Sequence, residues 1–238
     1  MIKNFCLLTI VFLFLNNMHC LSQSPSVEKI NPKKDFERVY GINPTLYNGL
    51  LYSTFYPGKV KGDQFFINSN YIKGEATIRG VKYYDLELNY DLYKQVLILK
   101  YINSSNMNNV IEISKAWLEN FTLGKYQFRY YGDNSNPKRF YQVLGSGSMM
   151  IFYHWEKKLE SENDYIGYTY YHFKTLKESY VFIDNTLKLY KNNKSFVQIF
   201  SKEKQSLIKD YLKQNKINVK TSSDQTMNEL INYCSKLY

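Results

Sequence analysis

The chain has 238 residues, a formal net charge of +10, and 24 tyrosines with 15 phenylalanines. This length suits one well-packed domain, and aromatic side chains are enriched in strands. After residue 15 no apolar run approaches the roughly 20 residues of a membrane-spanning helix, which excludes a transmembrane span in the rest of the chain. The basic residues are spread along the chain rather than clustered, and their excess favours anionic partners in general.

The first 22 residues have the pattern of a secretory signal peptide. Lys3 precedes an apolar run over residues 5–15, and small residues lie before a cleavage site ahead of Gln23. A lipoprotein signal would use Cys20, but the residues before it, NMH, lack the leucine and small side chains of such a site, so we do not expect lipidation there. We therefore expect export to the periplasm or cell envelope, with secretion as an alternative, and no nucleic-acid partner.

After a polar leader over residues 23–45, we expect a single domain over residues 46–238, with an antiparallel sheet over 46–184. Short connections favour antiparallel pairing of successive strands in a meander. The predicted strands cover 50–56, 64–68, 74–80, 82–90, 95–102, 109–114, 117–123, 126–131, 139–145, 148–158, 164–174 and 179–184.

Residues 185–238 have a helical pattern. A short helical turn comes first, and residues 195–214 then carry apolar side chains at spacings of three and four. Ser222 or Ser223 is a good N-cap for a last helix, in which Cys234 would be a small buried apolar residue. The chain is thus predicted to be α+β, with a long, curved, half-barrel-like antiparallel sheet and C-terminal helices packed on it.

Polar and apolar residues alternate in the stretch YYDLELNYD (83–91). This alternation is typical of an antiparallel strand with one wet face, and it leaves a cation or glycan-hydroxyl site as the alternative. Asp91 begins a turn that its side chain could cap. The predicted exposed set is Asp85, Glu87 and Asn89, and the predicted buried set is Tyr84, Leu86, Leu88 and Tyr90.

The next strand, VLILKYI (96–102), is apolar on both faces except for Lys100. A strand of this kind lies centrally in a sheet and is covered on both sides. We expect the C-terminal helices to cover its second face.

Several stretches resemble an uncharacterised family of exported proteins from Bacteroidetes-type bacteria. They are LYNGLLY (46–52), GDQFF (62–66), GEATIRGVKYYDLELNYDLYKQVLIL (74–99), ENFTL (119–123), FYQVLGSG (140–147) and LINYCSKLY (230–238). The resemblance implies export and a single domain, and it implies no activity or catalytic residues.

Two histidines remain after the predicted signal peptide. If the hairpin between their strands turned near Asn163, His154 and His172 would lie opposite each other, and with Glu156 they could form a metal site for a hydrolase. No HExxH-type spacing supports this site, so ordinary cross-strand polar side chains are the preferred interpretation. We expect no cofactor.

The tyrosine-rich stretch YIGYTYYHF (165–173) suggests an aromatic platform for sugar rings or lipid. Tyr168 and Tyr170 would share one face of a strand, and Tyr171 and Phe173 the other. Packing of these rings into the sheet's own core is the competing interpretation.

We therefore expect a non-catalytic cell-envelope protein that binds a partner or an apolar ligand, such as an envelope component, a lipid or another protein. The chain has neither a phosphate-binding loop nor a G-x-S-x-G nucleophile motif. The alternative is the metal-assisted hydrolase described above. The sequence leaves the oligomeric state open.

Overall fold

The computed structural model describes residues 43–238 except 55, 57, 104 and 164. The predicted signal peptide and nearly all of the polar leader lie outside these residues. Within the described part of the chain, no helix is both long and apolar enough to cross a membrane.

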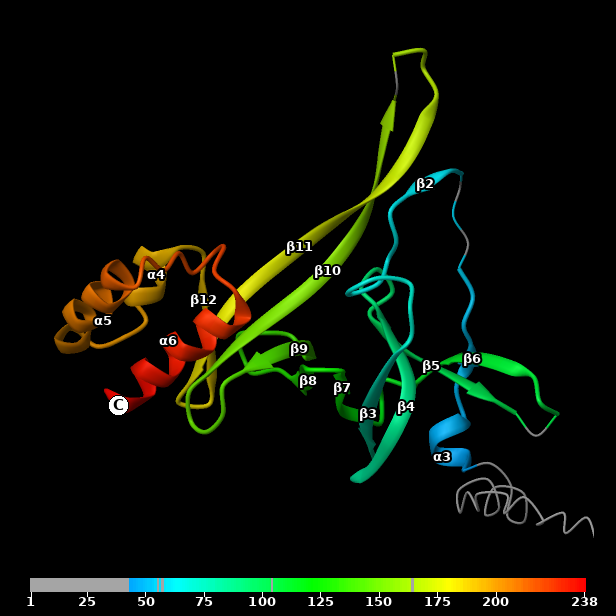
Figure 1. The fold of residues 1–238 in the computed structure, drawn as a ribbon, viewed down its shortest axis with the longest axis horizontal. Coiled ribbons are helices and arrows are strands. Elements are labelled where there is room, and N and C mark those ends of the chain that lie inside the picture. The colour runs from blue at the N-terminus through cyan, green and yellow to red at the C-terminus, as the bar shows by residue number, and fades with distance from the viewer. Residues whose placement is uncertain (1–42, 55, 57, 104, 164) are drawn as a thin grey trace, which may run out of the picture. The chain divides into compact units, whose positions relative to one another are not determined.

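The protein is α+β, as predicted. A 12-stranded open sheet precedes the C-terminal helices (Figure 1). The strands are β1 (Leu50–Leu51), β2 (Val60–Lys61), β3 (Ile72–Ile78), β4 (Val81–Asp91), β5 (Val96–Ile102), β6 (Asn108–Glu112), β7 (Leu118–Leu123), β8 (Tyr126–Tyr131), β9 (Arg139–Leu144), β10 (Met150–Asn163), β11 (Thr169–Ile183) and β12 (Thr186–Tyr190). The helices are α3 (Pro44–Tyr47), α4 (Asn193–Val197), α5 (Lys202–Gln214) and α6 (Asp224–Lys236).

The strand order departs from a simple meander at three places: β1 pairs with β6, β2 pairs in parallel with β11, and β7 pairs with β3. The order is β1-β6-β5-β4-β3-β7-β8-β9-β10-β11-β12, so β7 pairs with β3 and not with its neighbour in sequence, β6. Ala76 on β3 lies opposite Phe121 on β7, and both side chains are buried in the same core. The predicted strand 64–68 is not regular: it makes one bridge, between Phe65 and Asp91.

The alternation on β4 is interrupted by a bulge. Asp85 has a left-handed φ of 54°, and the pairing with β3 shifts register between Gly74 and Ala76. Because a bulge adds one residue to the strand, Tyr83 packs against the core while Tyr84 is 60% exposed, contrary to the prediction. Leu86, Leu88 and Tyr90 are buried, and Asp85 is exposed, as predicted.

Asn89 was predicted to be exposed but is buried. Its Nδ2 donates to the carbonyl oxygens of Asn68 and Asn70 at 2.9 and 3.1 Å. A buried amide needs such partners, and the 68–70 loop supplies them. The polar face of β4 is therefore partly an internal attachment for a loop.

Asp91 caps the β4–β5 turn, as predicted. Oδ1 accepts hydrogen bonds from the backbone N–H groups of Tyr93 and Lys94, each at 2.8 Å, and Oδ2 accepts one from the Tyr52 hydroxyl at 2.8 Å. The side chain is fully buried, and burial raises the pKa of its carboxyl, an effect that these hydrogen bonds oppose. Gln64 donates in turn to the Tyr52 hydroxyl, which completes the network.

The same turn is bonded to β10, five places further along the strand order. The carbonyl oxygen of Leu92 accepts from the Lys157 N–H at 3.1 Å. Gln95 Nε2 donates to the carbonyl oxygens of Leu92 and Trp155 at 2.7 and 2.9 Å. The sheet therefore curves until β4 and β10 come into contact, without closing into a barrel.

The C-terminal helices cover β10–β12 and not β5, contrary to the prediction. Their buried residues form one core with Ile151, Tyr153 and Val181, and the described part of β5 contributes nothing to that core. The second face of β5 carries Ile98, which is fully buried. Across the strands Ile98 is flanked by Asn89, which is hydrogen-bonded to the 68–70 loop, and by Glu112. Glu112 is paired with Lys94, whose ammonium also donates to the carbonyl of Ser53. The segment before β3 therefore covers this face.

Residues 186–190 form strand β12, where a short helical turn was predicted. Asp184 and Asn185 have left-handed φ values of 51° and 57°, which is the geometry of a two-residue hairpin turn that matches strand twist. Burial of Leu187 and Tyr190 holds the strand in the sheet.

The last helix begins as predicted, with the Ser223 side chain accepting a hydrogen bond from the Thr226 N–H. Cys234 on this helix is 1% exposed and free, and burial raises the pKa of its thiol to about 12. The predicted helix over 195–214 is interrupted between α4 and α5, where residues 198–201 turn.

We predict that Asp91→Ala lowers the free energy of unfolding by about 3 kcal/mol, because three partly buried hydrogen bonds lose their acceptor. Glu87→Ala, on the same strand but partly exposed, is the matched control and should change it by less than about 0.5 kcal/mol. Urea unfolding followed by tryptophan fluorescence measures both. Equal effects of the two substitutions would show that the cap does not stabilise the fold.

Candidate functional site

The register of β10 and β11 separates the residues of the predicted metal site. His154 lies opposite Glu178, Glu156 opposite Leu176, and His172 opposite Glu160. Asn163 pairs with Thr169, so the hairpin is centred on residue 166 rather than on Asn163. The two histidines are therefore six residue pairs apart, about 20 Å along the strands. In the described ranges no group of three His, Cys, Asp or Glu residues is placed to hold a metal ion.

His154 is instead a buried structural side chain. It is 6% exposed, and its Nδ1 lies 3.2 Å from the carbonyl oxygen of Phe140. Burial lowers the pKa of the imidazole, and the nearby Arg139 guanidinium lowers it further. His172, in contrast, is partly exposed and lies 3.8 Å from Glu160 and 3.9 Å from Glu162.

Arg139 beside His154 is part of a satisfied polar network. Its Nη2 donates to the Tyr180 hydroxyl at 2.8 Å and to the Glu178 carboxylate, and its Nε donates to the Tyr141 hydroxyl at 3.0 Å. Burial raises the pKa of Tyr180 to about 12. Each group has a partner, so the network ties β9 to β11 and offers no free acid or base.

The predicted aromatic residues do not form one platform. Phe173 packs against Tyr56 and Tyr93, with each pair of ring centroids 5.6 Å apart. The backbone of Tyr171 pairs with β2 at Val60.

On the other face of β11, Tyr170 donates to Glu162 and lies beside His172, with their ring centroids 6.5 Å apart. Tyr168 is 72% exposed and precedes β11. The four residues are thus divided between a packed cluster and the exposed end of the hairpin.

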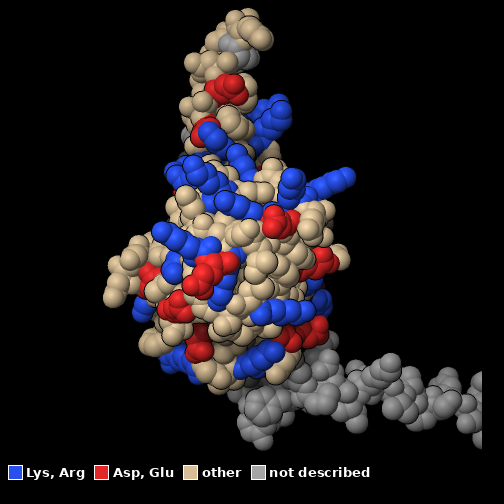
Figure 2. All heavy atoms as spheres, turned by 90° about the vertical axis from the view of Figure 1, so that its left-hand side faces the viewer, with Lys and Arg blue, Asp and Glu red and all other residues tan. Residues whose placement is uncertain are grey.

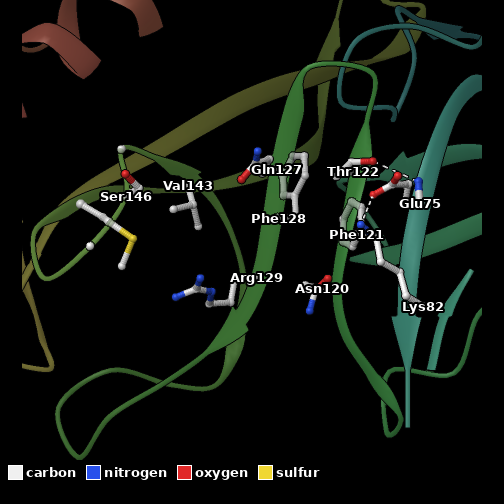
Figure 3. Close-up of a pocket in the computed structure, with 13 residues that line it drawn as sticks. Glu75, Lys82, Asn120, Phe121, Thr122, Gln127, Phe128, Arg129, Val143 and Ser146 are labelled. Carbon is white, nitrogen blue, oxygen red and sulfur yellow. Dashed lines mark hydrogen bonds and ion pairs between the residues drawn. The ribbon is translucent and has the colours of Figure 1, made fainter. Parts of the chain in front are cut away.

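A groove of about 450 Å³ crosses the outer face of β3, β4, β7, β8 and β9 (Figure 3). It arises because alternate residues of these strands point away from the core: Phe121 and Phe128 are buried, while their neighbours are partly or fully exposed. The polar side chains of the groove are Glu75, Lys82, Asn120, Thr122, Gln127, Arg129 and Ser146.

Gly74 allows β3 to approach β7 at this groove. A Cβ atom at position 74 would clash with the carbonyl oxygen of Thr122. The close approach lets the Glu75 N–H donate to Thr122 Oγ1 at 3.0 Å, and nearby the Thr77 hydroxyl donates to Asn120 at 2.9 Å. The centre of the groove is therefore held by hydrogen bonds between β3 and β7.

The charges of the groove are unevenly compensated. Lys82 Nζ lies 2.7 Å from Glu75 Oε2, so these two charges form an ion pair. The Arg129 side chain extends from β8 on the side away from this pair (Figure 3) and is exposed. Its guanidinium has neither a hydrogen bond nor an ion pair with any described residue. The groove thus offers one uncompensated guanidinium beside amide and hydroxyl groups.

Comparison of the chain with protein-family models, with curated proteins and with solved structures finds no match. The geometry of the described residues therefore carries the functional argument.

This groove was not predicted from the sequence. The alternation of Asn120, Thr122, Gln127 and Arg129 with aromatic and aliphatic residues indicates only a wet sheet face. What makes it a groove is the pairing of β3 with β7 and the 145–147 loop at its end, and neither could be read from the alternation.

We predict that the stability of the protein falls as the pH drops below about 6.5, because His154 must be protonated on unfolding but resists protonation when buried. The pKa of the His154 imidazole is lower in the folded than in the unfolded state. Its contribution to the free energy of unfolding is therefore fully present above the unfolded-state pKa and is lost as the pH falls towards the folded-state pKa. The free energy of unfolding, measured with urea between pH 7.5 and 5.5, should fall by up to about 1.4 kcal/mol per pH unit.

His154→Gln should remove this pH dependence, because glutamine does not titrate and its amide can still donate to the Phe140 carbonyl. His172→Gln, on the more exposed part of the hairpin, is the matched control and should keep it. A wild-type protein equally stable at both pH values would contradict the assignment.

Proposed function

We propose that the chain is an exported, non-catalytic cell-envelope protein that binds an acidic polysaccharide across the outer face of its sheet. The observation that carries this proposal is the uncompensated Arg129 guanidinium in a groove lined by amides and hydroxyls. Export is supported by the N-terminal signal-peptide pattern and by the family resemblance.

The lining favours binding over chemistry. Its one carboxylate, Glu75, is paired with Lys82, and no histidine or cysteine lines the groove. A hydrolytic site would place an available base beside a nucleophile and near donors for a developing negative charge. The groove instead presents side chains that donate and accept hydrogen bonds, at Asn120, Gln127 and Ser146.

The chemistry of the groove favours a hydroxyl-rich anion over an apolar ligand. The apolar residues that line it are Phe121, Phe128 and Met150, which are buried, and Val143, which is partly buried. Amide side chains can bond two neighbouring hydroxyls at once, and a planar guanidinium binds a carboxylate through two parallel hydrogen bonds. The strands that line the groove are paired on both edges, so an added peptide strand would find no free edge there.

We predict that the protein binds a tetragalacturonate probe and binds a neutral galactose tetramer at least tenfold more weakly. Arg129→Gln should lower the affinity for the acidic probe by about 10- to 100-fold, because a charged hydrogen-bond donor is removed. Isothermal titration calorimetry measures all three affinities.

Arg79→Gln is the matched control. This guanidinium lies over the Trp117 ring, 3.8 Å from its centroid, and does not line the groove. Its substitution should leave the affinity unchanged. Equal affinity for both probes, or equal losses in both variants, would overturn the proposal.

A further inference from the structure

The net charge of the chain is concentrated in one segment. Residues 185–223 contain nine lysines and only two acidic residues, a net charge of +7 of the total +10. This corrects the expectation that the basic residues are spread evenly. Figure 2, in which the end of the molecule with α4–α6 faces the reader, shows more basic than acidic side chains on that surface.

The lysines of this segment also differ from those of the sheet region in their partners. None of the nine forms an ion pair with a carboxylate anywhere in the described ranges, although six lysines of the sheet region do. Those six are Lys73, Lys82, Lys94, Lys100, Lys157 and Lys174. The sheet region therefore neutralises some of its lysines with carboxylates of its own, and the helical segment leaves the charge of all nine available to a partner.

Four of these lysines surround an apolar groove of about 400 Å³ between α4, α5 and the turn after α5. Val197, Leu212 and Ile217 line its floor. The rim consists of Lys194, Lys209, Lys213 and Lys216, all exposed.

Hydrogen bonds fix the walls of this groove. Asn193 Nδ2 donates to the carbonyl oxygen of Ile217 at 2.7 Å, and Asn193 Oδ1 accepts from the Val219 N–H at 2.9 Å, which joins α4 to the turn after α5. The Ile217 N–H donates to the Leu212 carbonyl at 2.8 Å and ends α5. The groove is therefore built into the fold.

Lys216 occupies a position where the backbone favours glycine. Its φ of 50° is left-handed, and it lies just after the C-cap of α5, where helices that end in this conformation usually carry glycine. A lysine here costs stability relative to glycine. Its presence on the rim fits a role for its charge.

We propose that this groove is a docking site for anionic phospholipids at a bilayer surface. The four ammonium groups would contact lipid phosphates, and the apolar floor would receive the hydrocarbon next to the headgroup. Clusters of four to eight basic residues on a helix are known to bind anionic membranes. An apolar floor distinguishes a lipid from a soluble polyanion, which carries its charge without hydrocarbon.

The experiment is flotation of the protein, without its predicted signal peptide, with vesicles of phosphatidylcholine alone or mixed with phosphatidylglycerol. The protein should float with the anionic vesicles, remain unbound with the neutral ones, and dissociate when the salt is raised from about 0.05 M to about 0.5 M. Replacing Lys194, Lys209, Lys213 and Lys216 with glutamine should reduce partitioning by on the order of a hundredfold.

The control variant replaces Lys59, Lys125, Lys138 and Lys158 with glutamine. These are exposed lysines of the sheet region, and the change in net charge is the same. This variant should bind almost as the wild type does. Equal losses in the two variants would mean that net charge alone causes binding, and that would overturn the proposal.

Lys216→Gly separates binding from folding. Glycine suits the left-handed backbone, so this variant should melt at a higher temperature and yet bind anionic vesicles more weakly. Binding to neutral and anionic vesicles alike, or retention on a heparin column without any vesicle binding, would overturn the proposal. The sheet groove and its Arg129 variant are tested separately, so either site can fail alone.

Discussion

The contact between the β4–β5 turn and β10 determines how the sheet is arranged. Strand pairing by itself leaves β4 and β10 five places apart, and it allows the sheet to be flat or curved. Leu92, Gln95 and Lys157 supply the hydrogen bonds that fix the curvature. They can do so because Asp91 Oδ1 holds the turn in one conformation by accepting hydrogen bonds from the backbone N–H groups of Tyr93 and Lys94.

This curvature divides the inner face of the sheet into two cores. One core lies within the curve of β3–β9, and the other lies between β10–β12 and the helices; Trp155 packs against both. At the junction, Trp155 Nε1 donates to Gln142, and Gln142 donates to Asp224 at the start of α6. The helical segment, with its unpaired lysines, is thereby attached to the sheet by polar as well as apolar contacts.

Local patterns in the sequence predicted much of the fold, and non-local pairing accounts for what they missed. The Asp91 turn and the Ser223 cap depend on residues within three positions, and both were predicted correctly. The β3–β7 pair and the histidine register depend on which distant residues meet, and alternation carries no information on that. The bulge at Asp85 and the hairpin at Asp184–Asn185 are local, but non-glycine residues take the left-handed positions and so conceal the usual turn signal.

The two grooves likewise combine features that local sequence shows with features that only the folded structure shows. The alternation over residues 120–129 shows which side chains are polar but not that Gly74 brings two strands close enough to make a recess. The lysine-rich segment was visible in the sequence. Its significance depends on the absence of ion pairs between those lysines and described carboxylates, in contrast to the six paired lysines of the sheet region.

The burial of Cys234 has a consequence for the reactivity of its thiol. With its pKa raised to about 12, it holds its proton at neutral pH, and its 1% exposure keeps oxidants and alkylating reagents away. In the oxidising compartment to which the proposed export would deliver the chain, the folded protein would neither cross-link nor form sulfenic acid at this position. Only detachment of α6 would expose the sulfur, so thiol labelling would report directly on how often that helix leaves the sheet.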